Sequence, residues 1–357
     1  MVNVIGLDIG GANTKAVFLS TKNGFIKELK TATEYFPVWK NPERLSSVLS
    51  QLKKRVSGSV EPDCAGVTMT AELSDAYRTK REGVNHIIAC IIQAFHSMPV
   101  FVLDVDATLR SIEEAKSEPL KVAAANWAAT GWMVSKLIKN CIVIDVGSTS
   151  TSIIPVVEGI VSATGKTDLE KLMNGELVYT GSLRTNIAAI VNSIPIRNGV
   201  ARVSSELFAL SGDVHLVLGN ITEKEFTVET ADRQGKTRAE AMARLARVVC
   251  ADIEMLTEQE IIQIAKHVYD MQIEQVTDGL SQVYARIKSR AKAKIVAVIT
   301  GLGKDFLARN AAQRVGIDEI IDLSELVGSD IATVSPAVGV ALMTATKLEG
   351  RAVKWTP

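Results

Sequence analysis

Short apolar runs broken by polar turns fill the first third of the chain and predict strands early in the fold. Asn23-Gly24 is a hairpin signal between two such runs. Asn41 and Pro42 have the order of a helix cap followed by proline at the first helical position, and leucines then recur at helical spacing. The elements expected here are strands at 4–9, 14–17, 25–31, 64–70 and 100–106 and helices at 41–52 and 84–96.

Longer periodic segments follow and alternate with buried strands, which predicts an α/β protein. A helix rich in small residues, able to approach another helix closely, is expected at 123–132, and a second one opens at Ser335. The stretch 220–238 is polar and predicts a surface flap. The other expected elements are strands at 141–146, 153–156, 294–300 and 317–323 and amphipathic helices at 237–255, 257–266 and 268–291.

A chain of 357 residues is too long for one small core, and two domains are expected. We place the first at 1–125 and the second at 126–345, with the flap near 220–238 inserted in it. The tail at 346–357 is expected to be loosely attached.

The charge balance favours small-molecule substrates, because 40 basic and 40 acidic residues cancel and leave no field for nucleic acid or a membrane surface. No apolar run reaches the length of a membrane span, and the N-terminus is already a strand rather than a signal peptide. The four cysteines lack metal-site spacing, which indicates a reducing compartment. We therefore expect a cytoplasmic protein and leave a homo-oligomer open.

The turn after the first strand combines groups that bind phosphate and a divalent cation. Glycines let a ligand approach the backbone, and successive N–H groups in such a turn form a concavity for phosphate oxygens. Asp8 would carry the cation. The residues of this turn are Asp8, Gly10, Gly11, Asn13, Thr14 and Lys15.

The same order of residues returns about 135 positions later. An apolar run ends in Asp145, a glycine and a hydroxyl-rich turn follow, and a second apolar run begins. Two copies of this pattern predict two similar domains, each offering an anion-binding turn and a carboxylate to a shared cleft. The second turn consists of Asp145, Gly147, Ser148, Thr149, Ser150 and Thr151.

Other polar residues are candidates for substrate contact. Glu72 and Asp75 follow a buried strand, where α/β proteins bind ligands, although a solvated loop explains them equally well. Arg184 could hold a phosphate or remain a surface charge, and His215 is expected to be a buried, satisfied histidine. The turn Gly301-Leu302-Gly303 opens a helix and suits an anion or nucleotide.

This order of motifs resembles the actin-like ATPase fold, whose ribonuclease H-like domains, each a mixed sheet flanked by helices, are duplicated around a central cleft. The resemblance covers nearly the whole chain. It implies that the turns at Asp8 and Asp145 are the two phosphate motifs, that 301–303 is the adenosine motif, and that the two small-residue helices cross beneath the hinge.

A narrower set of segments resembles one branch of the hydantoinase/oxoprolinase-like proteins, which serves methanofuran-dependent one-carbon metabolism. These segments include 8–15, 36–40, 68–75, 125–127, 179–185 and 206–209. The resemblance implies a transferase that joins the diphosphate ester of an aminomethyl-furanmethanol to the phenol of γ-glutamyltyramine, giving an aryl ether and diphosphate. Ser152 stands where the family pattern has an Asp, which weakens a carboxylate role there.

The implied chemistry places diphosphate on both turns, with Mg²⁺ bound through Asp8 and Asp145 and with Lys15 and the turn hydroxyls on its oxygens. The phenol needs a base, because its pKa of about 10 leaves it protonated at neutral pH. The residues left open for that role are Glu72, Asp75, Asp104, Asp213 and His215.

Two rival functions use the same motifs. One is an ATP-dependent small-molecule kinase that binds its nucleotide at Gly301 and Gly303. The other is a nonenzymatic hinge protein gated by a nucleotide, which would need a partner domain that the sequence does not display.

Overall fold

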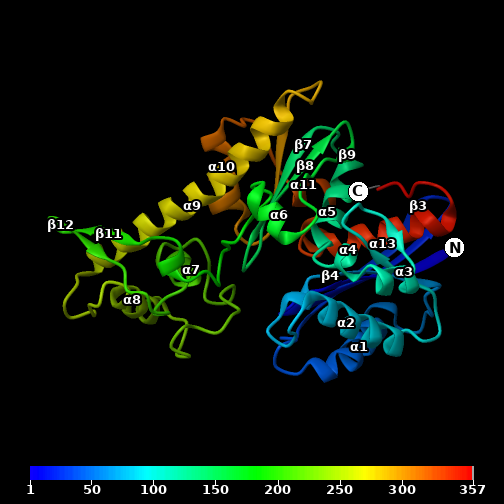
Figure 1. Ribbon diagram of the computed structural model, residues 1–357, viewed down its shortest axis with the longest axis horizontal. Coiled ribbons are helices and arrows are strands. Elements are labelled where there is room, and N and C mark those ends of the chain that lie inside the picture. Colours follow the sequence, from blue (N-terminus) through cyan, green and yellow to red (C-terminus); the bar gives the residue numbers. More distant parts are fainter. Residues whose placement is uncertain (356–357) are drawn as a thin grey trace. The chain divides into compact units, whose positions relative to one another are not determined.

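The computed structural model describes residues 1–355 and divides the chain into two compact units (Figure 1). Unit 1 consists of Met1–Cys141, Ile154–Lys171 and the described chain from Leu323 onward; unit 2 consists of Ile142–Ile153 and Leu172–Asp322. The division differs from the expected domains, because residues 126–141, 154–171 and the described chain from Leu323 onward group with unit 1.

Unit 1 is built on a six-stranded mixed sheet with the order β3-β2-β1-β4-β5-β6. β1, β2 and β3 form an antiparallel meander, and β4 and β5 extend it in parallel. The strands are β1 (Val2–Ile9), β2 (Asn13–Lys22), β3 (Phe25–Tyr35), β4 (Cys64–Met69), β5 (Val100–Leu103) and β6 (Leu109–Arg110). The near-continuous apolar character of β1 and β4 follows from burial on both faces of the sheet.

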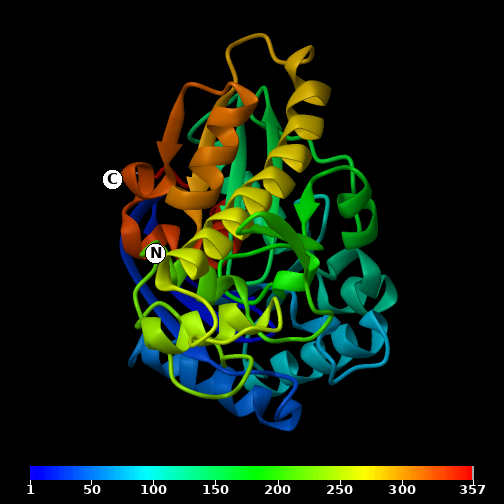
Figure 2. The same cartoon turned by 90° about the vertical axis from the view of Figure 1, so that its left-hand side faces the viewer.

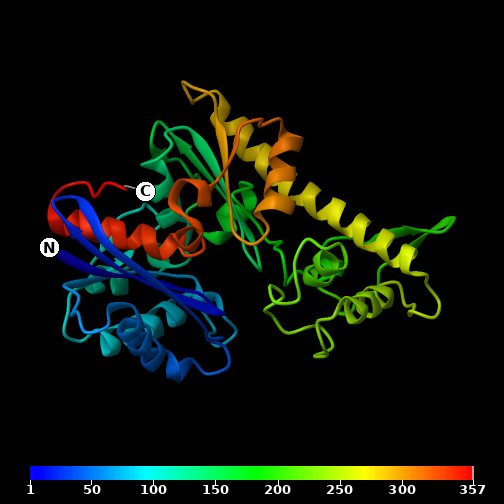
Figure 3. The same ribbon diagram turned by 180° about the vertical axis from the view of Figure 1, so that it is seen from behind.

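Helices cover both faces of this sheet. On one face, small residues let the last helix approach β1 closely. A Cβ at Gly6 of β1 would lie 2.1 Å from the Ala337 carbonyl oxygen, so this helix lies directly on the strand (Figure 3). That helix also meets α5, as the small residues of both predicted, and a Cβ at Gly339 would lie 2.4 Å from Ala129 O. The helices of unit 1 are α1 (Leu45–Ser57), α2 (Lys80–Ala94), α3 (Ile112–Ser117), α4 (Pro119–Val122), α5 (Asn126–Ser135), α11 (Leu323–Val327), α12 (Ser329–Ala332) and α13 (Ser335–Glu349), and α6 (Asp168–Met173) begins in it.

The second sheet repeats this topology with the order β10-β8-β7-β13-β14, and β9 pairs with β8. The three-strand meander followed by parallel strands is therefore present twice, which confirms the internal repeat and the actin-like class predicted from the two Asp-x-Gly turns. The strands are β7 (Cys141–Val146), β8 (Thr151–Val157), β9 (Ile160–Val161), β10 (Leu177–Val178), β13 (Val296–Thr300) and β14 (Ile320–Asp322). The chain enters unit 2 within β7 and returns to unit 1 within β8.

One long helix in unit 2 replaces two expected ones. α9 runs without interruption from Glu258 to Lys288 and crosses beside the strands of the second sheet (Figure 2). Gly279 lies within this helix without interrupting it. A Cβ at this position would lie 2.6 Å from Val178 Cγ2, so the glycine lets the helix approach β10. Its companions are the hairpin β11 (Ser193–Ile196) and β12 (Gly199–Arg202) and the helices α7 (Ser211–Val217), α8 (Arg238–Arg247) and α10 (Arg309–Val315).

Two segments are tied more firmly than the sequence predicted. The stretch 220–238 has no helix or strand before α8, but Phe226 is fully buried against Gly212 and Asp232 pairs with Arg244. The expected loose tail is wrong for its first part, because α13 continues to Glu349 and Lys354 N–H donates to Gly24 O at 2.8 Å. Residues 356–357 lie outside the described chain.

Candidate functional site

The first predicted phosphate turn connects β1 to β2 and is held in shape by its own backbone. Gly10 N–H donates to Asn13 O at 3.0 Å and closes the turn. The aromatic loop that follows β3 fixes it from outside, since Val38 N–H donates to Gly11 O and Phe36 N–H to Ala12 O, both at 2.9 Å. Within residues 1–355, the N–H groups of Gly11 and Ala12 have no backbone acceptor.

Buried hydroxyl groups without partners gather beside this turn. Thr14 and Thr68 are fully buried, and within the described chain neither hydroxyl has a hydrogen-bond partner. Asp8 pairs with Thr68 in the β1–β4 register, is 4% exposed, and has Lys15 Nζ at 3.8 Å from its Oδ2. Leaving buried hydroxyls unsatisfied is costly, which makes these two groups candidates for contact with a ligand.

A space for that ligand exists above the turn. A Cβ at Gly11 would meet nothing within 4 Å, whereas one at Gly10 would collide with Asn13 O at 2.6 Å. Gly10 is therefore required by the turn itself, and Gly11 leaves the backbone accessible. The chemistry of the set is one carboxylate, one ammonium, two hydroxyls and backbone N–H groups, which suits a phosphate ester with a divalent cation.

Glu72 lies in the 3₁₀ turn directly after β4 and is 1% exposed. Within residues 1–355 neither carboxylate oxygen pairs with a side chain, although the backbone N–H groups of Glu72 and Ala124 act on the carboxyl. Burial raises the pKa of Glu72 to about 7, while Lys80 and the backbone N–H of Ala124 favour the charged form. Ala124 has φ +50°, a strained value for a residue with a side chain. The pKa of Glu72 is thus placed where a general base is effective at neutral pH.

Charges around Glu72 come from two other elements. Lys80, at the start of α2, forms an ion pair with Asp168, at the start of α6, and both act on the Glu72 carboxyl. Gly83 lets α2 reach the loop, since a Cβ there would lie 2.6 Å from Glu72 O. Asp75, by contrast, is exposed at the end of the same loop.

The second predicted phosphate turn has the same backbone plan. Gly147 N–H donates to Ser150 O at 3.0 Å, and the segment 182–184 donates three N–H groups to the carbonyls of Gly147 and Ser148. Arg184 takes part through its backbone, and its side chain is exposed. The two turns therefore have the same spacing from Asp to Thr and close with the equivalent backbone hydrogen bond.

The side chains of the second turn are used differently. Thr151, the counterpart of Thr14, donates its hydroxyl proton to Thr180 O at 2.8 Å. A Cβ at Gly301, whose φ is +85°, would lie 2.4 Å from Val146 O and 2.7 Å from Asp145 Oδ1. Gly303 donates its N–H to Val146 O at 3.0 Å. The predicted nucleotide turn thus packs against the end of β7, and its glycines are needed for that contact.

A buried polar network supports the loop that covers the second turn. Gln272 donates to Thr180 Oγ1 and to Gly181 O, and its own oxygen faces His215 Nε2 at 3.0 Å. Burial lowers the pKa of His215 to about 3, so this histidine is neutral and structural, the role expected for it.

Asp213 and Asp104 also have structural partners. Asp213 is fully buried and pairs with the fully buried Arg244, whose Nη2 lies 2.8 Å from Asp213 Oδ1. Burial nevertheless raises the pKa of Asp213 to about 6. Asp104 accepts from Asp106 N–H, Thr108 N–H and Arg110 Nε. Among the acids left open as bases, Glu72 has a buried carboxylate without such a partner.

The site residues predicted from the sequence are divided between the two units. The first turn, Glu72 and Asp75 belong to unit 1, and the second turn, Arg184, Asp213, Gly301 and Gly303 belong to unit 2. Thr68 was missed by the sequence analysis, because a threonine inside an apolar strand carries no signal until the register places it opposite Asp8.

No group of three or more His, Cys, Asp or Glu side chains in residues 1–355 is arranged to bind a metal ion. A magnesium ion does not require one, since it commonly binds one or two carboxylates together with substrate phosphates. In the same part of the chain, no helix is both long and apolar enough to cross a membrane.

Comparisons with known proteins agree with this architecture. The chain is 38% identical over 351 residues, 98% of its own length and 99% of the relative's, to (4-{4-[2-(γ-L-glutamylamino)ethyl]phenoxymethyl}furan-2-yl)methanamine synthase of Methanocaldococcus jannaschii. The protein of the same name from Methanococcus vannielii is 35% identical over 60% of this chain and 94% of its own. The nucleotide-free structure of acetone carboxylase covers 96% of this chain and 70% of its own, with a TM-score of 0.55 and 9% identity, a likeness in fold alone.

A family-level match spans most of the chain. Residues 63–347 match the hydantoinase/oxoprolinase family, and this range includes β4, Glu72, the second turn and most of α13. This match, together with the 38% identity to the relative from Methanocaldococcus jannaschii, shows that the chain belongs to the hydantoinase/oxoprolinase family.

Proposed function

We propose that this protein is a transferase of methanofuran biosynthesis that forms an aryl ether between a furan methylene carbon and the phenol of γ-glutamyltyramine. The name of the full-length relative describes the product of such a reaction. The structural observation that carries the proposal is the pair of buried, unpartnered hydroxyls of Thr14 and Thr68 beside Asp8 and Lys15. These groups suit an anionic, oxygen-rich leaving group such as diphosphate.

The first turn would bind the diphosphate ester of the aminomethyl-furanmethanol. The hydroxyls of Thr14 and Thr68 and the N–H groups of Gly11 and Ala12 are donors for its oxygens, and Lys15 offsets its charge. Such preorganised donors stabilise the charge that develops on a leaving group. We propose that Asp8 holds Mg²⁺ at this turn. When bound, the ion would neutralise diphosphate charge and assist its departure.

Glu72 would act as the general base. Its carboxylate accepts the phenolic proton, the phenol oxygen forms a bond to the furan methylene carbon, and the carbon–oxygen bond to diphosphate breaks. Diphosphate leaves with the bonding electron pair, so atoms and charges balance. The pKa of about 7 at Glu72 matches this task, because the base form is available at neutral pH and still takes up a proton. The neighbouring Leu73 is 51% exposed, so the loop carrying Glu72 reaches solvent.

One incubation tests the proposal. Purified protein is mixed with the furan diphosphate, γ-glutamyltyramine and Mg²⁺, without ATP, and ether and diphosphate are measured. Equimolar ether and diphosphate are expected. No ether under these conditions, with or without other divalent cations, would contradict the proposal.

An ATP-dependent kinase is the second candidate, and the placement of Gly301 against Asp145 and Val146 is the observation that favours it. A glycine turn at the end of β13, next to a phosphate turn, is arranged as a nucleotide motif would be. The same incubation distinguishes the two, because a kinase would require ATP and release ADP.

A further inference from the structure

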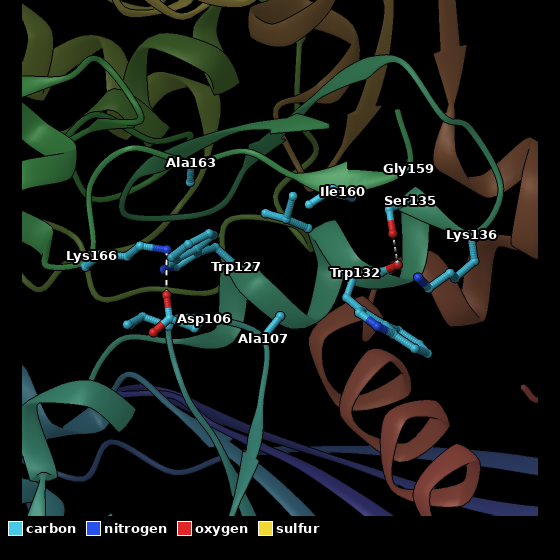
Figure 4. A pocket seen from close by; sticks show the side chains of 12 residues that line it. Asp106, Ala107, Trp127, Trp132, Ser135, Lys136, Gly159, Ile160, Ala163 and Lys166 are labelled. Carbon is cyan, nitrogen blue, oxygen red and sulfur yellow. Dashed lines mark hydrogen bonds and ion pairs between the residues drawn. The ribbon is translucent and has the colours of Figure 1, made fainter. Parts of the chain in front are cut away.

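A cavity of about 220 Å³ lies in unit 1, outside the residues assigned to the reaction so far. It is bounded by the loop after β5, by α5 and by the segment from β9 to α6 (Figure 4). The lining side chains used below are Asp106, Trp127, Trp132, Lys136 and Lys166.

The charges on this cavity are placed at separate points. Lys166 Nζ lies 2.7 Å from Asp106 Oδ1 on one side, and both side chains are about half exposed (Figure 4). Lys136 Nζ lies on another side, 5.1 Å from the centroid of the Trp132 ring. The adjacent ammonium of Lys166 and carboxylate of Asp106 suit a ligand that carries a carboxylate and an ammonium of its own.

The walls of the cavity are flat and aromatic. Trp127 is 5% exposed, and Lys171, which is 2% exposed, has its Nζ 3.8 Å from the centroid of that ring. This contact fixes the indole, since a buried ammonium over an aromatic face is strongly attracted to it. A fixed indole offers a rigid apolar surface for a short alkyl chain or a ring.

The cavity and Glu72 share their supporting elements. Trp127 lies on α5 three residues after Ala124, whose backbone N–H acts on the Glu72 carboxyl. α6 carries two of the contacting residues, one helical turn apart. Its Asp168 pairs with Lys80, and its Lys171 lies over the Trp127 ring. A ligand in the cavity is therefore held by the helices that also surround Glu72.

We infer that this cavity binds the γ-glutamyl end of the phenolic substrate, an inference that rests on the proposed function. The α-carboxylate of the glutamyl group accepts a hydrogen bond from Lys166, and its α-ammonium donates to Asp106. The chain leading to the phenol lies against Trp127. An unsubstituted tyramine would leave the charged part of the cavity without a partner.

Kinetics with two acceptors tests this inference. Asp106→Asn and Lys166→Met are compared with wild type using γ-glutamyltyramine and tyramine, at saturating furan diphosphate. Each variant is expected to raise KM for γ-glutamyltyramine about tenfold, the worth of one charge-assisted hydrogen bond, with kcat unchanged. KM for tyramine should not change. Lys139→Met, an exposed lysine just after α5 and outside the cavity, is the matched control.

A binding measurement separates this inference from the proposed function. Calorimetric titration of γ-glutamyltyramine needs no furan substrate, and binding by wild type that weakens in both variants supports the cavity even if no ether forms. Ether formation with unchanged binding and KM in both variants overturns the cavity and leaves the function standing. Wild type that does not bind γ-glutamyltyramine, or variants that impair both acceptors equally, also overturn it.

Discussion

The two glycine turns have the same backbone hydrogen bond but different side-chain environments, and the difference lies in whether the buried threonine hydroxyl is already satisfied. Both close with an N–H to carbonyl bond of 3.0 Å, from Gly10 in the first turn and Gly147 in the second. In the first, the hydroxyl of Thr14 is buried without a partner. In the second, the matching hydroxyl of Thr151 bonds to Thr180 O. The same pattern in sequence therefore leaves donors available in one turn and satisfies them internally in the other.

The neighbours of each turn explain the difference. The second turn is packed by the loop at 180–185, where a Cβ at Gly181 would lie 2.5 Å from the carbonyl carbon of Thr149, and by Gly301. The first turn has no such cover over Gly11, where a Cβ would meet nothing within 4 Å. Unpartnered buried polar groups are costly, so they persist where a ligand supplies the missing bonds.

The largest expected effect is at the carboxylate of the first turn. Asp8→Asn should lower ether formation about 10³-fold or more, because it removes the charge proposed to hold the metal ion. Turnover in the ATP-free assay measures this, and circular dichroism checks the fold. Asp145→Asn in the same assay shows how far the second turn contributes. Retained turnover in Asp8→Asn would remove the metal role from the first turn.

Glu72→Gln should lower kcat about 10²-fold, since the amide cannot accept the phenolic proton. In wild type, the acid limb of the kcat profile should have its midpoint near pH 7, the pKa to which burial raises Glu72. That limb should be missing from the variant. Asp75→Asn is the control from the exposed end of the same loop and should keep the limb. A wild-type acid limb near pH 4.5 would assign the base elsewhere.

The same substitution makes a prediction about stability. Because the folded-state pKa of Glu72 is raised from 4.5 to about 7, ionisation of this group opposes folding. The contribution of the protonated Glu72 carboxyl to the free energy of unfolding is complete below pH 4.5 and is lost as the pH rises through about 7. Glu72→Gln should therefore unfold at higher denaturant than wild type at pH 8, by on the order of 3 kcal/mol, and the gain should vanish near pH 4. Equal gains at both pH values would show that Glu72 is not buried as described.

The smallest effects test the comparison of the turns directly. Thr14→Val removes a hydroxyl with no partner, so stability should not fall, while activity should drop about tenfold if that hydroxyl binds the diphosphate. Thr151→Val leaves Thr180 O without its donor and should cost about 1–3 kcal/mol of stability. Denaturation and turnover are measured for both variants. A stability loss in Thr14→Val, with none in Thr151→Val, would reverse the assignment of the two turns.

Local sequence patterns predicted most of the elements, because glycine turns, hairpin signals and helical spacing act over a few residues. Asn23-Gly24 marked the β2–β3 hairpin, and Ser335-Pro336 marked the start of α13. The continuity of α9 was not predicted: helices were expected at 257–266 and 268–291, and the structure joins them in one helix from Glu258 to Lys288. The partners of Asp213 were also unpredictable, because Arg244 lies 31 residues away.

The sequence by itself determined the family, the repeated Asp-x-Gly turns and the residues that could bind an anion. Only the tertiary structure decided which of those residues have partners. It gave Asp213, Asp104 and Thr151 internal bonds, and within residues 1–355 it left Thr14, Thr68 and Glu72 buried without a side-chain partner. The physical reason is that a hydrogen bond depends on distance and direction between atoms far apart in the chain, and residue order does not specify either. The Asp8 turn is a candidate site because the fold leaves the hydroxyls beside it unsatisfied.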